Sequence, residues 1–102
     1  MFLVQLLLPV YEGPGRRVPR ERFTEVRDEL THKYGGVTAF LRSPAQGTWK
    51  EQSGTVDHDD VVMCEVMVDS LDRSWWTEYR STLERRFGQR ELVMRAVQIE
   101  RL

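Results

Sequence analysis

The stretch VVMCEVMV at residues 61–68 decides the fold, because it has the length of a β-strand and apolar side chains on both of its faces. Its only charged residue is Glu65, near its centre. The run FLVQLLLPV at residues 2–10 has the same character, and its one hydrophilic side chain is Gln5. Each run therefore predicts a central strand of one sheet, with both faces of the strand covered.

Two segments with helical periodicity separate the predicted strands. Residues 19–34 begin with Pro, carry apolar side chains three and four residues apart, and are followed by the C-capping pair Gly35-Gly36. Residues 72–87 begin with Asp as a plausible N-cap and are followed by a further Gly. We expect the second helix to bury one stripe of side chains, made of Trp75, Tyr79, Leu83 and Phe87.

Strand-like runs at residues 37–41 and 92–99 complete the order β-α-β-β-α-β. Right-handed connections then predict an α+β fold, the ferredoxin-like βαββαβ sandwich. Its antiparallel strands have the order 4-1-3-2, and both helices cover one face of the sheet. We expect a single domain, residues 1–102, in which the two apolar runs are the central strands.

Charge and composition narrow the class of protein. Fifteen Lys and Arg residues oppose sixteen Asp and Glu residues, which argues against a binder of nucleic acid. The third strand also lacks the aromatic side chains that an RNA-recognition sheet exposes. Cys64 is the only cysteine, so no disulfide can form within one chain. The apolar run at 2–10 has no basic leader and about half the ~20 residues of a membrane span. We expect a cytoplasmic protein that binds neither nucleic acid nor membrane.

The uncovered face of the sheet predicts a partner. Two helices cover one face only, yet Leu3 and Leu7 on the first strand and Met63 and Met67 on the third would point to the other. An exposed apolar patch of this kind is usually an interface. We therefore expect a homodimer stacked sheet to sheet. The alternatives are a monomer with an apolar surface, or a different protein as partner.

The element order, the length and the doubly apolar central strands resemble the dimeric α+β barrel superfamily. The stretches GGVTAF at 35–40 and GTW at 47–49 are similar to small bacterial proteins of unknown function in that group. The superfamily holds cofactor-independent monooxygenases, small isomerases and cyclases, and haem-handling proteins. The resemblance implies the fold and the dimer. Its short motifs carry no catalytic residue of the superfamily, so it implies no particular activity.

Polar residues inside the apolar strands are the main candidates for a site. In the order 4-1-3-2, Arg95, Gln5 and Glu65 would form a row across the uncovered face, and Arg42 or Thr38 would extend it. A buried carboxylate needs a partner or a raised pKa. The row would therefore either line a small-molecule cavity between two sheets or be a paired network that fixes the register of the dimer.

Three further side chains are candidates away from this row. His58 lies in the acidic stretch DHDD at 57–60, where it is either a base near neutral pH or part of a solvated loop. Trp49 and Trp76 would either pack against a ligand or belong to the core. No spacing typical of a metal site accompanies the histidine, and we predict neither a metal nor a cofactor.

These residues support two hypotheses of function. The first is a small-molecule-binding homodimer. If it is catalytic, it would be a cofactor-independent enzyme that transfers protons on, or oxygenates, a small, largely apolar organic molecule. Glu65 or His58 would then be the acid or base, and Arg42 or Arg95 would hold an anionic group. The alternative is a non-catalytic dimer for protein interaction or regulation. A cavity that touches the polar row favours the first hypothesis, and dense packing with paired charges favours the second.

Overall fold

The computed structural model describes residues 1–36, 38–42 and 61–102. The elements within these ranges are, in chain order, β1 (Phe2–Pro9), α1 (Arg20–Tyr34), β2 (Thr38–Arg42), β3 (Val61–Val68), α2 (Arg73–Arg86) and β4 (Met94–Gln98). The expected α+β class is confirmed, and each observed element overlaps the run of sequence that predicted it.

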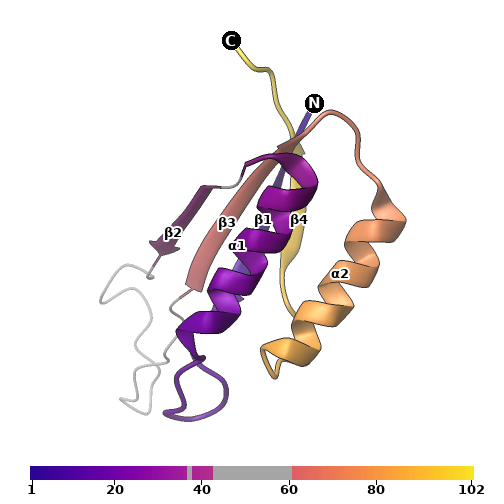
Figure 1. Cartoon of the computed structure of the whole chain (residues 1–102). Coiled ribbons are helices and arrows are strands. Elements are labelled where there is room, and N and C mark those ends of the chain that lie inside the picture. Colours follow the sequence, from indigo (N-terminus) through magenta and orange to yellow (C-terminus); the bar gives the residue numbers. More distant parts are fainter. Residues whose placement is uncertain (37, 43–60) are drawn as a thin grey trace, which may run out of the picture.

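The four strands form one antiparallel sheet. β1 pairs with β3 on one side and with β4 on the other, and β2 pairs with β3. The order is β2-β3-β1-β4, which reads 4-1-3-2 from the opposite edge, so the two most apolar strands are central. Figure 1 shows both helices on the same side of this sheet. No described helix lies over its other face.

The core lies between the sheet and the two helices. Alternate residues of β1 point into it, as the two-residue period of a strand requires. Of these, Val4, Leu6 and Leu8 are almost completely buried. The same cluster takes in Cys64, Val66 and Val68 of β3, Val26 and Leu30 of α1, and Leu83 near the C-terminal end of α2.

The face that α2 presents to the core differs from the prediction at its first turn. The predicted stripe is buried from Tyr79 onward, but Trp75 is only half-buried, whereas Trp76 is 5% exposed. Trp76 instead stacks on Tyr34 of α1 with 6° between the ring planes, and Trp75 stacks on Tyr79. These two tryptophans precede Tyr79 by four and three residues, and both spacings fall on one side of a helix. Periodicity alone therefore does not separate them.

Helix ends follow the sequence signals. The side chain of Asp72 accepts a hydrogen bond of 3.1 Å from the N–H of Trp75, which makes it the N-cap of α2. Gly35 ends α1 in the left-handed conformation, with φ of 78°, and its N–H donates to the carbonyl of Thr31. A side chain at position 35 would be strained, so this turn into β2 favours glycine.

A charged clamp joins the two helices on their outer surface. Both terminal nitrogens of Arg86 in α2 donate to the carboxylate of Glu29 in α1, and the hydroxyl of Tyr79 donates to the same carboxylate at 3.1 Å. The hydrogen bonds from Arg86 hold the pKa of Glu29 below its ordinary value. Bidentate pairs of this kind fix the relative position of two elements as well as adding energy.

We expect the replacement Glu29→Gln to destabilise the protein at neutral pH and to have little effect in acid. Because the pKa of Glu29 is lowered in the folded state, its charged form adds stability above the ordinary carboxyl pKa, and this is lost as pH falls through the folded value. The carboxylate is 40% exposed, so solvent screening limits the loss to roughly 1 kcal/mol. Urea titrations at several pH values measure it. A deficit that stays constant with pH would contradict this account.

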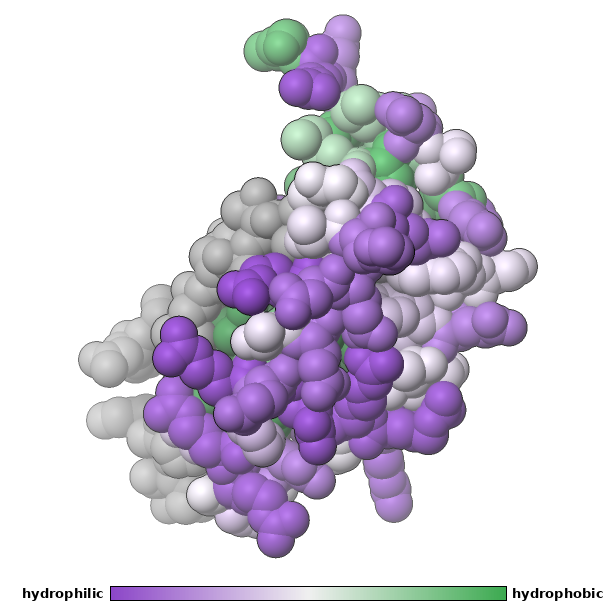
Figure 2. Space-filling model, viewed as in Figure 1, coloured by the Kyte–Doolittle hydropathy of each residue, from purple (hydrophilic) through white to green (hydrophobic). Residues whose placement is uncertain are grey.

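The outer surface of the helix layer is polar. Figure 2 shows hydrophilic side chains over most of the helix-bearing side of the molecule. Among the residues that the structure describes, no helix is both long enough and apolar enough to cross a bilayer. The helix layer therefore buries its apolar side chains against the sheet and offers solvent a charged exterior.

Candidate functional site

The uncovered face of the sheet carries three rows of side chains that run across the strands. Backbone register places Leu3 opposite Met67 and Val97, and two residues further along β1 it places Gln5 opposite Glu65 and Arg95. The next row contains Leu7 and Met63. One polar row therefore lies between two apolar rows on this face.

Side-chain hydrogen bonds connect the polar row from end to end. The amide nitrogen of Gln5 donates to Oε2 of Glu65 at 2.7 Å. The amide oxygen of Gln5 accepts from Nε of Arg95 at 2.8 Å. The amide is thus oriented by both neighbours, because a carboxylate only accepts and a guanidinium only donates. The row has a positive end on β4 and a negative end on β3.

Direct pairing of Arg95 with Glu65 is not what the structure shows. Their strands are separated by β1, and adjacent strands lie about 4.8 Å apart, so the two charges are bridged by Gln5. Within the described chain, Oε1 of Glu65 and the terminal nitrogens of Arg95 have no hydrogen-bond partner. Each end of the row therefore keeps polar atoms free for a further contact.

Register also decides between the two residues proposed to extend the row. Thr38 of β2 lies opposite Glu65, so it occupies the next position in line. Arg42 pairs with Val61, at the far end of β2, and does not extend the row. The expectation for Arg42 as part of this row was therefore wrong, because the register between β2 and β3 was not known from the sequence.

Within the described ranges, the structure brings no further predicted site residue into the row. His58 and Trp49 lie outside the described residues. Trp76 is buried on the helix side of the sheet, in contact with the core, so it does not lie on the same face as Gln5, Glu65 and Arg95. The indole of Trp76 and the hydrogen-bonded side chains of the polar row therefore lie on opposite faces of the sheet.

Several apolar side chains beside the row are open to solvent in the single chain, whereas Met63 in the row of Leu7 is already buried. Met67 is 52% exposed, Val93 51% and Val97 44%. A broad, open depression of about 940 Å³ adjoins the row, lined among others by Leu3, Glu65 and Met67. It extends toward the C-terminal end of α1. This face therefore offers both an apolar contact surface and a hollow next to a carboxylate.

Cys64 is a buried residue of the core. Its side chain points to the helix side of β3, and burial raises the pKa of its thiol to about 11. A thiol with that pKa stays protonated near neutral pH, and the thiolate is the reactive form. In the described parts of the chain, no three His, Cys, Asp or Glu side chains gather in a way that could hold a metal ion.

A second cavity, which the sequence reasoning missed, lies between α2 and β4. It has a volume of about 160 Å³, and Arg73, Thr77 and Arg80 line it from one side of α2. The spacing of these three residues, i, i+4 and i+7, is that of one helix face and is visible in the sequence. What the sequence did not reveal is that this polar stripe faces the edge strand, because that depends on how α2 is rotated.

Comparisons with known proteins add no family. No family model matches the chain, and no curated protein and no solved structure matches it. The features that bear on function are therefore the sheet face and the cavity beneath α2.

Proposed function

We propose that this chain is a ferredoxin-like protein that acts as a homodimer, stacked through the uncovered sheet face, and binds a small molecule between the two sheets. The observation that carries the proposal is the hydrogen-bonded row Arg95–Gln5–Glu65 between two apolar rows. Exposed apolar rows on both sides of a charged row are typical of a binding surface, because large apolar patches rarely remain in contact with solvent.

The opposite charges at the two ends of the polar row support a second copy of the chain as the partner that covers this face. Two sheets stacked face to face are related by a two-fold axis that lies in the plane between them. If the axis runs along the strands above Gln5, Arg95 of one copy faces Glu65 of the other, and apolar rows face apolar rows. The row is thus complementary to its own reversed copy.

The depression beside the row supports a ligand site. A second sheet about 10 Å away would roof the depression lined by Leu3, Glu65 and Met67 and turn it into a cavity. The free Oε1 of Glu65 would accept a hydrogen bond from the ligand, and Arg95 would hold an anionic group. Glu65 is also the proposed acid or base, if the site is catalytic.

A non-catalytic interaction dimer is the second candidate, and one observation favours it. The polar row is hydrogen-bonded along its whole length in the single chain. Paired networks of this kind can fix the register of an interface without doing chemistry. Ligand binding that is lost on Glu65→Gln, in a dimer that stays intact, would separate the two candidates.

The replacement Met67→Asp should convert the dimer into a monomer. Met67 is chosen over its neighbour Met63 because it is exposed, whereas Met63 is 2% exposed and a charge there would also destabilise the fold. A charge at position 67 must be desolvated in the interface, so we expect the dissociation constant to rise at least about tenfold. Analytical ultracentrifugation at micromolar concentration measures it.

The control is Thr31→Asp, an equal change of charge on the exposed side of α1. It should leave the dimer intact, and both variants should keep the far-UV circular dichroism of the wild type. A wild-type chain that sediments as a monomer at this concentration would overturn the proposed dimer.

A further inference from the structure

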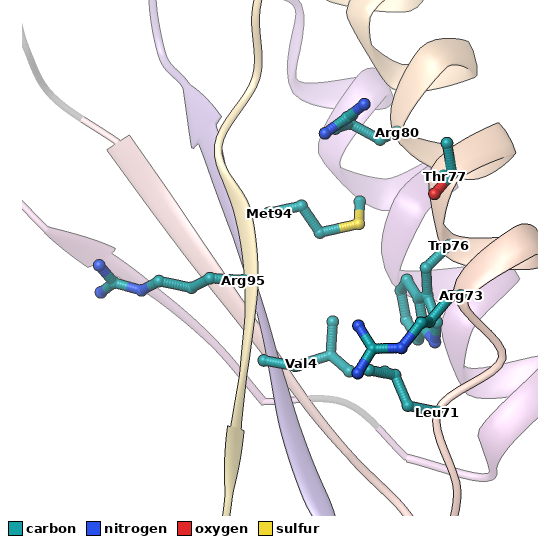
Figure 3. Close-up of a pocket in the computed structure, with 9 residues that line it drawn as sticks. Val4, Leu71, Arg73, Trp76, Thr77, Arg80, Met94 and Arg95 are labelled. Carbon is teal, nitrogen blue, oxygen red and sulfur yellow. The ribbon is translucent and has the colours of Figure 1, made fainter.

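The cavity between α2 and β4 combines cationic side chains on one side with apolar side chains at its base. Figure 3 shows Arg73 and Arg80 extending from α2 toward β4, with Met94 between them. The buried side chains of Val4 and Trp76 lie at the base of the cavity. Arg95 also borders the cavity, but its guanidinium points away from it, to the other face of the sheet.

Both cavity arginines are without an acidic partner. Within the described residues neither Arg73 nor Arg80 has a hydrogen bond or an ion pair, and no Asp or Glu lines the cavity. Three other helix arginines, Arg22, Arg27 and Arg86, form ion pairs with carboxylates of α1, whereas Arg20 and Arg85 form none within the described residues. Two uncompensated guanidiniums beside one cavity favour a bound anion, since the guanidinium fork fits carboxylate oxygens.

One residue that lines the cavity, Trp76, also carries a buried donor. The indole nitrogen of Trp76 is buried and has no hydrogen bond within the described chain. Tyr34 stacks parallel on the indole, with 6° between the ring planes. Buried donors in native proteins are nearly always satisfied, so a missing one calls for an acceptor. An oxygen of a ligand seated in the cavity is such an acceptor.

The spacing of the arginines and the volume set the class of ligand. Seven residues of α-helix span about 10 Å, which places the two guanidiniums at opposite ends of the apolar floor. The volume of about 160 Å³ is close to that of apolar cavities that hold one benzene ring, about 150 Å³. A short molecule with an anionic group at each end and an apolar middle matches both features.

We propose that the cavity between α2 and β4 binds a small organic dicarboxylate, one carboxylate on Arg73 and the other on Arg80, with its apolar spacer over Met94 and Trp76. This site goes beyond the proposed dimer, because one chain supplies all of its residues and it lies on the helix side of the sheet. Thr77, one turn after Arg73, is placed to donate its hydroxyl to the bound molecule.

Calorimetric titration with adipate and hexanoate tests the proposal, because the two acids have the same chain length and differ by one carboxylate. We expect adipate to bind at least about tenfold more tightly. Arg80→Gln and Arg73→Gln should each reduce adipate binding to the level of hexanoate. Arg85→Gln, the matched control on the same helix but outside the cavity, should leave adipate binding unchanged.

A second readout reports on the floor of the cavity. Adipate should shift the indole N–H resonance of Trp76, assigned by comparison with Trp76→Phe, in a ¹⁵N-correlated spectrum. Equal binding of the two acids, loss of binding in Arg85→Gln, or no binding of adipate at millimolar concentration would each overturn the proposal. Repeating the titration on Met67→Asp separates it from the dimer, since adipate should still bind to that monomer.

Discussion

Replacing Leu83 by Ala should lower the free energy of unfolding by about 2–5 kcal/mol, as removal of a large buried aliphatic side chain does. Leu83 is 0% exposed near the C-terminal end of α2, and it belongs to the cluster that joins both helices to β1 and β3. A domain of this size is stable by only about 5–15 kcal/mol, so the loss would be a large fraction of the whole. Denaturant titration monitored by tryptophan fluorescence measures it.

Glu78→Ala provides the control for this substitution. Glu78 is exposed on the same helix, and replacing it should change stability by no more than about 0.5 kcal/mol. Both variants place alanine in α2, and leucine and glutamate have similar helix propensities. The difference in stability between the two variants therefore reports the burial of Leu83. A cost below about 0.5 kcal/mol for Leu83→Ala would mean that α2 does not pack on the sheet as described.

The central strands and their polar row were predictable because a strand has a fixed two-residue period. The run at residues 61–68 became β3 with those bounds, and Gln5 met both Glu65 and Arg95 in register. Each polar residue lies near the middle of its run, so pairing the runs centre to centre was enough to align them. The predicted topology placed β1 between β3 and β4, which brings the three polar residues onto neighbouring strands.

The details that failed depend on angles that a sequence does not carry. Trp75 and Trp76 are adjacent residues of the same type. Which of them faces the core depends on the rotation of α2 about its axis. That rotation also decides whether Arg73 and Arg80 face β4 or open solvent. The bridging of the two charges by Gln5 depends on side-chain rotamers and on the distance across two strand spacings.

Reversing one end of the polar row should abolish the proposed dimer, by an effect larger than that of Met67→Asp. In Arg95→Glu both ends of the row are negative, and each faces a negative end of the other copy. The two-fold axis repeats the contact, so two attractive pairs become two repulsive ones. Breaking one close charge pair in an interface costs about 2–5 kcal/mol, so we expect the dissociation constant to rise at least about a hundredfold. Sedimentation of the variant measures this.

Mixing two monomeric variants then tests whether opposite charges pair across the interface. Arg95→Glu has two negative ends and Glu65→Arg has two positive ends, so each should be monomeric alone and the two should form a heterodimer when combined. The double reversal, Arg95→Glu with Glu65→Arg, restores a row of opposite ends and should dimerise with itself. Gln5 can turn its amide to serve the exchanged charges, so the single chain keeps its hydrogen bonds. If the axis ran across the strands instead, Arg95 would face Arg95 and Glu65 would face Glu65 in the wild type, so Arg95→Glu would break no attractive pair and would leave the dissociation constant nearly unchanged. A wild-type dimer that Arg95→Glu does not weaken would therefore reject the two-fold axis along β1, and a mixture that stays monomeric would reject pairing of opposite charges in the interface.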